Sequence, residues 1–427
     1  MGTSYGGDSV FTTASTATIP NITTTAVTAI TSTTATSGGT ISTDGGATVT
    51  VRGVCWSTTV NPTIALSTKT INGTGIGTFT SAVTGLTAST LYHVRAYATN
   101  SVGTAYGNDI SFTTLSSTPD VYVAGYENSG TKDVAKMWKN GVAISLTDGT
   151  NDAEAYSVFV SGTDVYIAGY ENSGITSVAK IWKNGVSTAL TNGTNNAVAY
   201  SVYVSGTDVF VAGAEYNGTN YVAKIWKNGI ATSLTNGAND AEAYSVFILG
   251  TDVYAGGYEN NGTNDVAKTW KNGSATSLTD GTYQAGIYSV FAIGTDVYAA
   301  GSEENTALNN NAKIWKNTVP TSLINATNNG VAFSVFVGGT DVYVAGSEST
   351  PTSNSAAKYW KNGVVNVLTN GLNIAIGFSV YTFGTDVYVA GYENNGTKDV
   401  AKIWKNGVAT SLTNGLNDAN AYSIFVK

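Results

Sequence analysis

Apolar and polar residues alternate in short runs along the whole chain, with the period of two that is typical of β-strands. Between the runs lie clusters of Gly, Asn, Ser and Thr, which favour turns. The chain has 49 Gly and 25 Tyr but only 11% charged residues. Gly, Tyr, Thr and Asn are poor helix formers, and Tyr and Thr favour strands. We therefore expect an all-β protein.

Residues 116–427 form a tandem repeat. An aspartate opens each repeat, and successive ones are 44 or 45 residues apart: Asp120, Asp164, Asp208, Asp252, Asp296, Asp341 and Asp386. With small variations, each repeat holds four strand-like runs: D-V-Y-V-A-G-Y-E, V-A-K-I-W-K-N-G, V-A-T-S-L-T and A-Y-S-V-F-V-S-G-T. Asn-Gly within K-N-G predicts a two-residue hairpin turn. Four strands at this period predict a β-propeller, and seven repeats predict seven blades.

The two ends of the array complement each other. The array begins at Asp120 with the second strand of the repeat, and it ends at residues 423–426 with the first strand. We therefore expect the C-terminal strand to complete the first blade and close the ring, which also removes exposed sheet edges. The alternative is an open solenoid, which needs capping repeats, and none is visible.

Two segments precede the array. Residues 1–18 are small and polar, and we expect a flexible tail there. Residues 19–115 show about seven short strands, which suggests an immunoglobulin-like sandwich. Three stretches, V-R-G-V-C-W-S-T at 51–58, L-Y-H-V-R-A-Y-A-T-N at 91–100 and G-T-A-Y-G-N-D-I-S-F-T-T at 103–114, resemble the fibronectin type III-like domains of bacterial secreted and surface proteins. That resemblance implies that Trp56 is the core tryptophan, that Tyr92 is the corner tyrosine, and that the domain is a spacer or adhesive module.

The array also resembles a known group of proteins. Its V-A-G-Y-E, A-K-I-W-K-N-G and A-Y-S-V-F-V stretches are similar to the tandem-repeat seven-bladed propellers of bacterial lipoproteins and secreted proteins. The resemblance implies a fold and an extracellular or cell-surface location more than an activity. S-S-T-P at 116–119 is interpreted as the junction between the two domains.

Some charged positions are the same in every repeat. A glutamate lies two residues after the V-A-G glycine, and a lysine lies two residues before the tryptophan. The glutamates are Glu127, Glu171, Glu215, Glu259, Glu303, Glu348 and Glu393, and the lysines are Lys136, Lys180, Lys224, Lys268, Lys313, Lys358 and Lys402. We expect seven cross-strand ion pairs. The alternative, a carboxylate ring for metal binding or catalysis, is disfavoured because an active site needs one asymmetric group of residues.

Aromatic positions are also repeated. The tryptophans Trp138, Trp182, Trp226, Trp270, Trp315, Trp360 and Trp404 lie between apolar neighbours, so we expect them in the core rather than stacked on sugar rings. An aromatic–Ser pair, from Tyr156-Ser157 to Tyr422-Ser423, begins each innermost strand. We expect these pairs to fill the central channel, with a ligand-binding ring at its mouth as the alternative.

The loops divide into two groups. The S-G-T-D and K-N-G turns barely change and are predicted to share one face, with the aspartate bonded to turn backbone and the lysine in solvent. The other two loops vary, and we expect the opposite face, which carries them, to bind a ligand. The candidate binding residues on it are Asp152, Glu154, Tyr216, Asp240, Glu242, Tyr283, Gln284, Glu304 and Asp418.

The net charge, the scarcity of Cys and His and the absence of catalytic motifs exclude several classes of function. With 20 Lys and Arg against 28 Asp and Glu, the net charge is −8, and no basic patch is present for nucleic acid. No apolar run reaches the length of a membrane span. One Cys and one His exclude an internal disulfide and most His-based metal sites and triads. No G-x-S-x-G, H-E-x-x-H or phosphate-loop motif occurs. We expect no metal and no cofactor.

These observations predict a non-enzymatic extracellular binding or adhesion protein. Its partner would be a glycan or a protein at the cell surface, with no nucleic acid and no membrane insertion, and its oligomeric state stays open. One alternative is a polysaccharide hydrolase or lyase that uses acids such as Asp152, Glu154, Asp240 or Glu242. Another is a structural component of a surface assembly.

Overall fold

The computed structural model describes residues 3, 6–10, 16–115 and 119–427. The chain divides into two compact units, Met1–Thr118 and Pro119–Lys427. Every element of the described ranges is a β-strand, so the expected all-β class is confirmed. Within them, no helix has the length and apolarity needed to cross a membrane. Much of the predicted tail and all but the last residue of the predicted junction at 116–119 lie outside the described residues.

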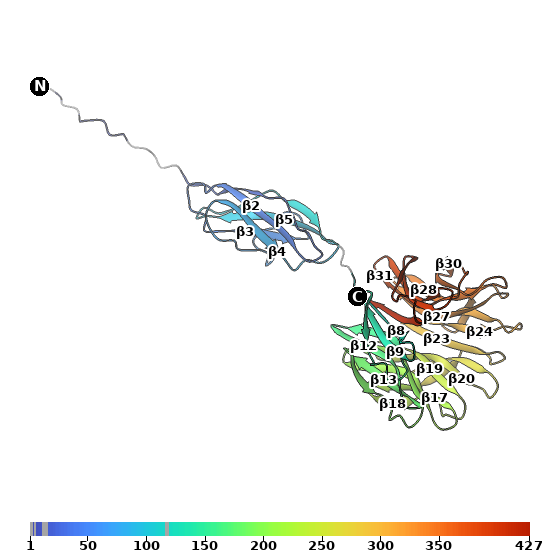
Figure 1. The fold of residues 1–427 in the computed structure, drawn as a ribbon. Helices are drawn as coiled ribbons and strands as arrows, with labels where there is room; N and C mark the ends of the chain where they lie inside the picture. The colour runs from blue at the N-terminus through green and yellow to red at the C-terminus, as the bar shows by residue number, and fades with distance from the viewer. Residues whose placement is uncertain (1–2, 4–5, 11–15, 116–118) are drawn as a thin grey trace. The chain divides into compact units, whose positions relative to one another are not determined.

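The first unit consists of two antiparallel sheets around one hydrophobic core (Figure 1). One sheet contains β1 (Asn21–Thr24), β2 (Ala35–Thr43) and β4 (Gly77–Val83). The other contains β3 (Val51–Ser57), β5 (Leu91–Thr99), β6 (Thr104–Tyr106) and β7 (Ile110–Thr113). Trp56 and Tyr92 are both buried in this core, and the Tyr92 hydroxyl accepts a hydrogen bond from the Thr87 backbone N–H at 3.1 Å. The prediction that Trp56 is a core residue is therefore confirmed.

The second unit, residues 119–427, consists of seven four-stranded antiparallel sheets, numbered here 1 to 7 in chain order. In sheets 2 to 7 the chain runs from the innermost strand to the outermost strand. The innermost strands of sheets 1 to 7 are β35 (Ala419–Val426), β11 (Ala153–Ser161), β15 (Ala197–Ser205), β19 (Ala241–Leu249), β23 (Ala285–Ile293), β27 (Asn329–Gly338) and β31 (Ala375–Phe383). The second strands are β8 (Val121–Asn128), β12 (Asp164–Ser173), β16 (Asp208–Tyr216), β20 (Asp252–Asn260), β24 (Asp296–Glu304), β28 (Asp341–Ser349) and β32 (Asp386–Asn394).

The outer half of each sheet is a hairpin with an Asn-centred turn. The third strands are β9 (Asp133–Lys139), β13 (Thr176–Lys183), β17 (Tyr221–Lys227), β21 (Asp265–Lys271), β25 (Asn310–Lys316), β29 (Ala356–Lys361) and β33 (Asp399–Lys405). The outermost strands are β10 (Val142–Ser145), β14 (Val186–Ala189), β18 (Ile230–Ser233), β22 (Ser274–Ser277), β26 (Val319–Ser322), β30 (Val364–Val367) and β34 (Val408–Ser411). The outermost strands are almost entirely exposed.

The C-terminal strand completes sheet 1. Strand β35 pairs antiparallel with β8, from Ala419 opposite Glu127 to Val426 opposite Val121. The innermost strands of successive sheets contact each other in order, and β35 contacts both β31 and β11. The sheets therefore follow one another in a closed circle, with the last strand of the chain in the first sheet, as the sequence predicted (Figure 1).

The repeated tryptophans and ion pairs have the structural roles that the sequence predicted. All seven tryptophans are at most 1% exposed, and each packs against the preceding sheet; Trp182, for example, shares a core cluster with Tyr122 and Ala135 of sheet 1. All seven Glu–Lys ion pairs are present. Their partners meet diagonally, since Val134 lies directly opposite Glu127. The repeated acids are thus paired within their own hairpins.

The constant turns are linked in a way the sequence did not predict. In sheet 2, Lys183 Nζ lies 2.8 Å from Asp164, and the Asn184 side-chain amide donates to the same carboxylate at 2.8 Å. The Asn184 oxygen accepts the Val165 N–H. The arrangement recurs in the other six sheets. The lysines are exposed, as expected, but each also pairs with the aspartate. The expectation that the aspartate bonds to the backbone of its own turn was wrong, because the two turns lie close enough for the carboxylate to accept from Lys and Asn side chains.

Candidate functional site

Two closed rings of aromatic side chains line the centre of the second unit. The upper ring, at the end where the innermost strands begin, contains Tyr156, Tyr200, Tyr244, Tyr288, Phe333, Phe378 and Tyr422. The lower ring contains Phe159, Tyr203, Phe247, Phe291, Phe336, Tyr381 and Phe425. Neighbouring ring centroids are 5.0–5.5 Å apart in the upper ring and 4.4–5.3 Å in the lower ring. The predicted role of the aromatic–Ser pairs in filling the channel agrees with this packing.

The serine of each pair joins neighbouring sheets. Its hydroxyl accepts a hydrogen bond from a backbone N–H in the innermost strand of the following sheet, as Ser157 does from Val202. Seven such bonds of 3.1–3.2 Å run round the circle. The upper ring therefore rests on a rigid frame, and differences between repeats determine the chemistry of the channel mouth above it.

The channel mouth is polar on one side and apolar on the other. Five members of the upper ring carry hydroxyls, whereas the adjacent Phe333 and Phe378 do not. The residue two positions before each ring member also differs from sheet to sheet. From sheet 2 round to sheet 1, these residues are Glu154, Val198, Glu242, Gly286, Val331, Ile376 and Asn420. Both acids precede tyrosines, and Val331 and Ile376 precede the two phenylalanines. A ligand at the mouth would therefore meet hydroxyl and carboxyl groups on one side and apolar groups on the other.

Glu154 lies among tyrosine hydroxyls. Tyr170 donates a hydrogen bond to its carboxylate at 3.1 Å, and the hydroxyls of Tyr156 and Tyr422 also face it. Burial raises the pKa of Glu154, and these hydroxyls lower it only in part. Burial, together with the Glu154 charge, raises the pKa of Tyr156 well above its usual range. Each tyrosine therefore stays a neutral hydrogen-bond donor at physiological pH.

Glu242 repeats this arrangement two sheets further on. Its neighbours are the hydroxyls of Tyr200, Tyr244 and Tyr258, and burial again raises the pKa of the carboxyl. Sheet 3, between the two acids, has Val198 at the equivalent position. The polar side of the mouth thus has two buried carboxyl groups, each held by tyrosines.

A small polar pocket of about 100 Å³ opens beside Glu242's tyrosines, between sheets 4 and 5. Its lining residues are Tyr244, Tyr258, Asp265, Gln284, Ala285, Gly286, Tyr288, Ser302 and Asn310. Two small residues make the space: Gly286 stands where Glu242 stands in sheet 4, and Ser302 where Tyr258 stands. A Cβ built on Gly286 would meet only the Tyr288 ring, at 4.0 Å. The pocket combines aromatic surfaces with several hydrogen-bonding groups.

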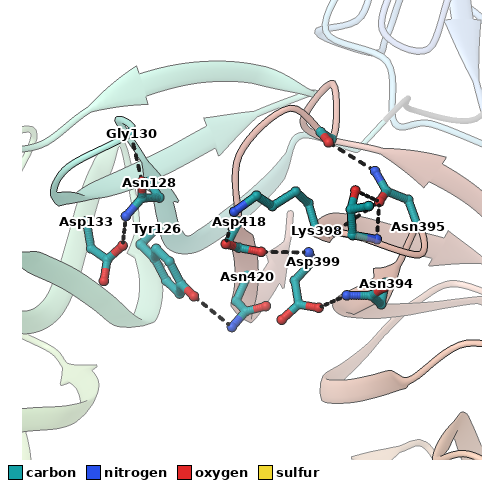
Figure 2. Close-up of polar contacts among 12 residues, drawn as sticks. Tyr126, Asn128, Gly130, Asp133, Asn394, Asn395, Lys398, Asp399, Asp418 and Asn420 are labelled. Carbon is teal, nitrogen blue, oxygen red and sulfur yellow. Dashed lines mark hydrogen bonds and ion pairs between the residues drawn. The ribbon is translucent and has the colours of Figure 1, made fainter.

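Four of the candidate residues predicted from the sequence have partners within the protein. Asp152, Asp240, Gln284 and Asp418 precede innermost strands, and each side chain accepts a backbone N–H from a hairpin of the preceding sheet, at 2.7–3.1 Å. Lys398 also pairs with Asp418 at 2.7 Å, and this contact lowers the pKa of the carboxyl (Figure 2). These residues support the loops of the variable face, and of the four only Gln284 lines the pocket. Their role in binding stays a prediction.

The other candidates are separated. Tyr216 lies at the end of β16, where its ring is 5.4 Å from that of Tyr221. Tyr283 is half-buried in the loop before β23. Glu304 ends β24, and its N–H donates to the Gln284 carbonyl at 2.8 Å. The structure brings Glu154 and Glu242 to the channel mouth, but it does not gather all nine candidates into one site.

Sequence reasoning missed several residues of the polar pocket. Tyr258, Asp265, Gly286, Ser302 and Asn310 were not among the candidates. The signal was present in the repeats, because Gly286 and Ser302 are smaller than their counterparts in most other sheets. Figure 2 shows the equivalent place in sheet 1, where the Asn420 amide reaches the Tyr126 hydroxyl at 3.3 Å and occupies this space.

The closed circle of four-stranded sheets around a central channel defines a β-propeller-type repeat protein. No family model matches the chain, and no curated protein matches it. Among solved structures, it is similar to TolB from Acinetobacter baumannii, with 10% identity, a TM-score of 0.37, and coverage of 78% of this chain and 77% of that one. It is also similar to a DUF4784 family protein from Bacteroides caccae ATCC 43185, with 9% identity, a TM-score of 0.30, and coverage of 95% and 98%.

Proposed function

We propose that this chain is a non-enzymatic extracellular binding or adhesion protein, in which a fibronectin type III-like domain is the spacer and a seven-bladed propeller carries the binding site. The seven sheets and the closure by β35 support the propeller. The buried Trp56 and the Tyr92 hydroxyl bond support the spacer assignment. A cell-surface location follows from the sequence resemblances of both parts.

The ligand we propose is a glycan, bound at the polar pocket and the polar side of the channel mouth. The observation that carries this proposal is the lining of the pocket. Tyr244 and Tyr258 offer aromatic faces for the apolar side of a sugar ring, while Asp265, Ser302 and Asn310 offer acceptors and donors for its hydroxyls. At about 100 Å³, the pocket holds one edge of a sugar, and the rest of the glycan lies over the tyrosines beside Glu242.

A protein partner is the second candidate, favoured by a different set of residues. On the variable-loop face, Leu372 is 75% exposed, Ile374 48% and Leu416 74%. Leu372 and Ile374 lie in the loop before β31, and Leu416 lies in the equivalent loop before β35. These loops lead into the innermost strands of sheets 7 and 1, which are neighbours in the ring. Exposed apolar residues in neighbouring loops are typical of protein-binding surfaces.

A hydrolase acting on polysaccharide is the enzymatic alternative. It is favoured by the raised pKa values of Glu154 and Glu242, because a general acid must keep its proton at the working pH. We prefer binding because each carboxyl already receives tyrosine hydrogen bonds. Release of reducing sugar from a polysaccharide that the protein binds, lost in Glu154→Gln or Glu242→Gln, would support the hydrolase instead.

The test is a glycan-array screen of the full chain, with two variants. Gly286→Val fills the pocket with the residue that sheet 3 has at this position, and we expect it to weaken glycan binding by about tenfold or more. Val331→Ile makes the matched change on the apolar side of the mouth, using the residue of sheet 7, and should leave glycan binding unchanged.

Two results would overturn the glycan assignment. Binding that survives Gly286→Val would place the site away from the polar pocket. No binding to any glycan, together with capture of a surface protein that is lost on Leu372→Ser and Leu416→Ser, would move the function to the protein-binding alternative.

A further inference from the structure

One interface between sheets differs from the other six in its packing. At six of the seven interfaces, a third-strand residue meets a second-strand residue of the following sheet in one core cluster. These pairs are Met137 with Ile167, Ile181 with Val211, Ile225 with Ala255, Ile314 with Val344, Tyr359 with Val389, and Ile403 with Val123. Between sheets 4 and 5 the corresponding residues are Thr269 and Ala299. Only there are both partners small.

The two small side chains leave a pocket at this interface. A cavity of about 260 Å³ lies between sheets 4 and 5 and is lined by both Thr269 and Ala299. Its walls are mainly apolar, with Tyr254, Leu278, Val290 and Trp315 among them. We call it the apolar pocket; it shares no lining residue with the polar pocket at the channel mouth. Empty space of this size costs packing energy, which the neighbouring interfaces avoid with larger side chains.

A buried tryptophan in the wall of the apolar pocket has no partner for its indole N–H in the described part of the chain. Trp315 is 1% exposed and packs in the same core cluster as Tyr254 and Ala299. Its indole N–H has no hydrogen-bond partner within the described residues. Trp270, which also lines the pocket, shares this property, and so do other tryptophans of the array. Both indole nitrogens are almost wholly covered by protein atoms, so the pocket offers a ligand its apolar surfaces rather than these donors.

The rim of the pocket holds a residue in an unfavourable conformation. The turn after Lys316 is Asn317-Thr318, and Thr318 has φ = 74°. A β-branched residue rarely adopts positive φ, and the other six sheets have glycine at this position of the turn. Both turn residues line the pocket and are exposed. Strained residues tend to gather at binding sites, where they position side chains.

We propose that the apolar pocket binds a small neutral aromatic molecule. Its ring fills the space between Thr269 and Ala299. There it packs against Tyr254, Leu278 and Trp315. The size agrees with this class, because an apolar cavity of about 150 Å³ is enough to take up benzene. The entrance lies between Lys271 and the Asn317–Thr318 turn, whose side chains are exposed.

The test uses 4′-fluoroacetophenone as the probe and ¹⁹F NMR titration of the full chain as the readout. We expect saturable binding at one site per chain. The double variant Thr269→Ile with Ala299→Val restores the side chains of the neighbouring interfaces, and we expect it to weaken binding by about tenfold or more while the melting temperature does not fall.

A second variant tests the same idea by gain of function. Ile181→Thr with Val211→Ala copies the small pair into the interface between sheets 2 and 3, and it should add a second site of similar affinity. The proposal is overturned if the unaltered chain shows no saturable binding up to the solubility of the probe. It is also overturned if the Thr269→Ile and Ala299→Val chain, with its fold intact, binds as tightly as the original.

Discussion

The hydroxyl of Ser423 accepts a hydrogen bond from the backbone N–H of Val158 at 3.1 Å, although 265 residues separate the two along the chain. This bond joins the last strand to the first strand of sheet 2, and it completes the circle of seven serine bonds. The closed ring therefore depends on the C-terminal segment as much as on any internal repeat.

Removing this bond should destabilise the second unit. Ser423→Ala leaves the buried Val158 N–H without a partner, and we expect a loss of about 1–2 kcal/mol in the free energy of unfolding. Urea unfolding measures it. Ser187→Ala, on the exposed strand β14, is the control and should change stability by less than about 0.5 kcal/mol. Equal stabilities for the two variants would show that the closing contact is unimportant.

The two families of ion pairs should differ in strength. In sheet 3, Glu215 and Lys224 are 2.5 Å apart with side chains about a fifth exposed, whereas Lys227, paired with Asp208, is 54% exposed. A double-mutant cycle should give a coupling of about 1 kcal/mol for Glu215–Lys224 and a smaller one for Asp208–Lys227. The second coupling should also fall further in high salt. A larger coupling energy for Asp208–Lys227 than for Glu215–Lys224 would contradict the expectation that burial strengthens the pair.

Stability should depend on pH through the two acids at the channel mouth. Burial raises the pKa of Glu154 and Glu242 in the folded protein, so the unfolded chain releases these protons first. Their contribution to stability therefore falls as pH rises from the ordinary value of 4.5 through the folded pKa. The double variant Glu154→Gln with Glu242→Gln should remove this fall, as seen by urea unfolding between pH 4 and pH 7.

Asp148 provides a control, because its contribution to stability changes with pH in the opposite direction. The backbone N–H of Thr150 holds the pKa of Asp148 below its ordinary 3.8, so the stabilisation it provides is lost as pH falls through the folded pKa. Asp148→Asn should flatten the profile only in the acid range. If the double variant Glu154→Gln with Glu242→Gln changed the stability profile only in this acid range, the claim that burial raises the pKa of the two glutamates would be wrong.

Relieving the strained turn should stabilise the protein. Thr318→Gly restores the residue that six sheets have at this position, and we expect a gain of about 1 kcal/mol, because glycine adopts positive φ without steric cost. The converse change, Gly273→Thr in sheet 4, should cost a similar amount. Thermal and urea unfolding of both variants measure the effect, and a loss of stability in Thr318→Gly would show that the Thr318 side chain makes compensating contacts.

Much of the fold was predictable because its determinants are local and repeated. Alternation between apolar and polar residues identifies the strands, and Asn-Gly identifies the hairpin turns. The missing first strand at Asp120 and the extra strand at 423–426 together predict closure. Tryptophan in an apolar strand predicts a core position, and Glu and Lys at fixed hairpin positions predict ion pairs. Except for closure, which is predicted from the two complementary ends, the partner lies within one repeat or in the equivalent repeat next to it.

The site was less predictable because its residues meet only across sheets. Asp152 and Asp418 lie in variable loops, yet their carboxylates bind the backbone of the preceding sheet. Glu154 faces Tyr422, which is distant in sequence and becomes a neighbour only when the ring closes. The acids and loops were visible in the sequence, but which of them face the channel mouth depends on packing.

The sequence by itself determined the strands, their number in each repeat, the closure of the ring and the repeated core, since period and residue type carry that information. Only the tertiary structure decided where the ring loses its symmetry. Gly286 and Ser302 make one pocket, and Thr269 and Ala299 make another, both between sheets 4 and 5. Gly286 and Ser302 pair within sheet 5, whereas Thr269 and Ala299 belong to different sheets. In both cases two small residues leave a cavity only because of how the neighbouring sheet packs against them.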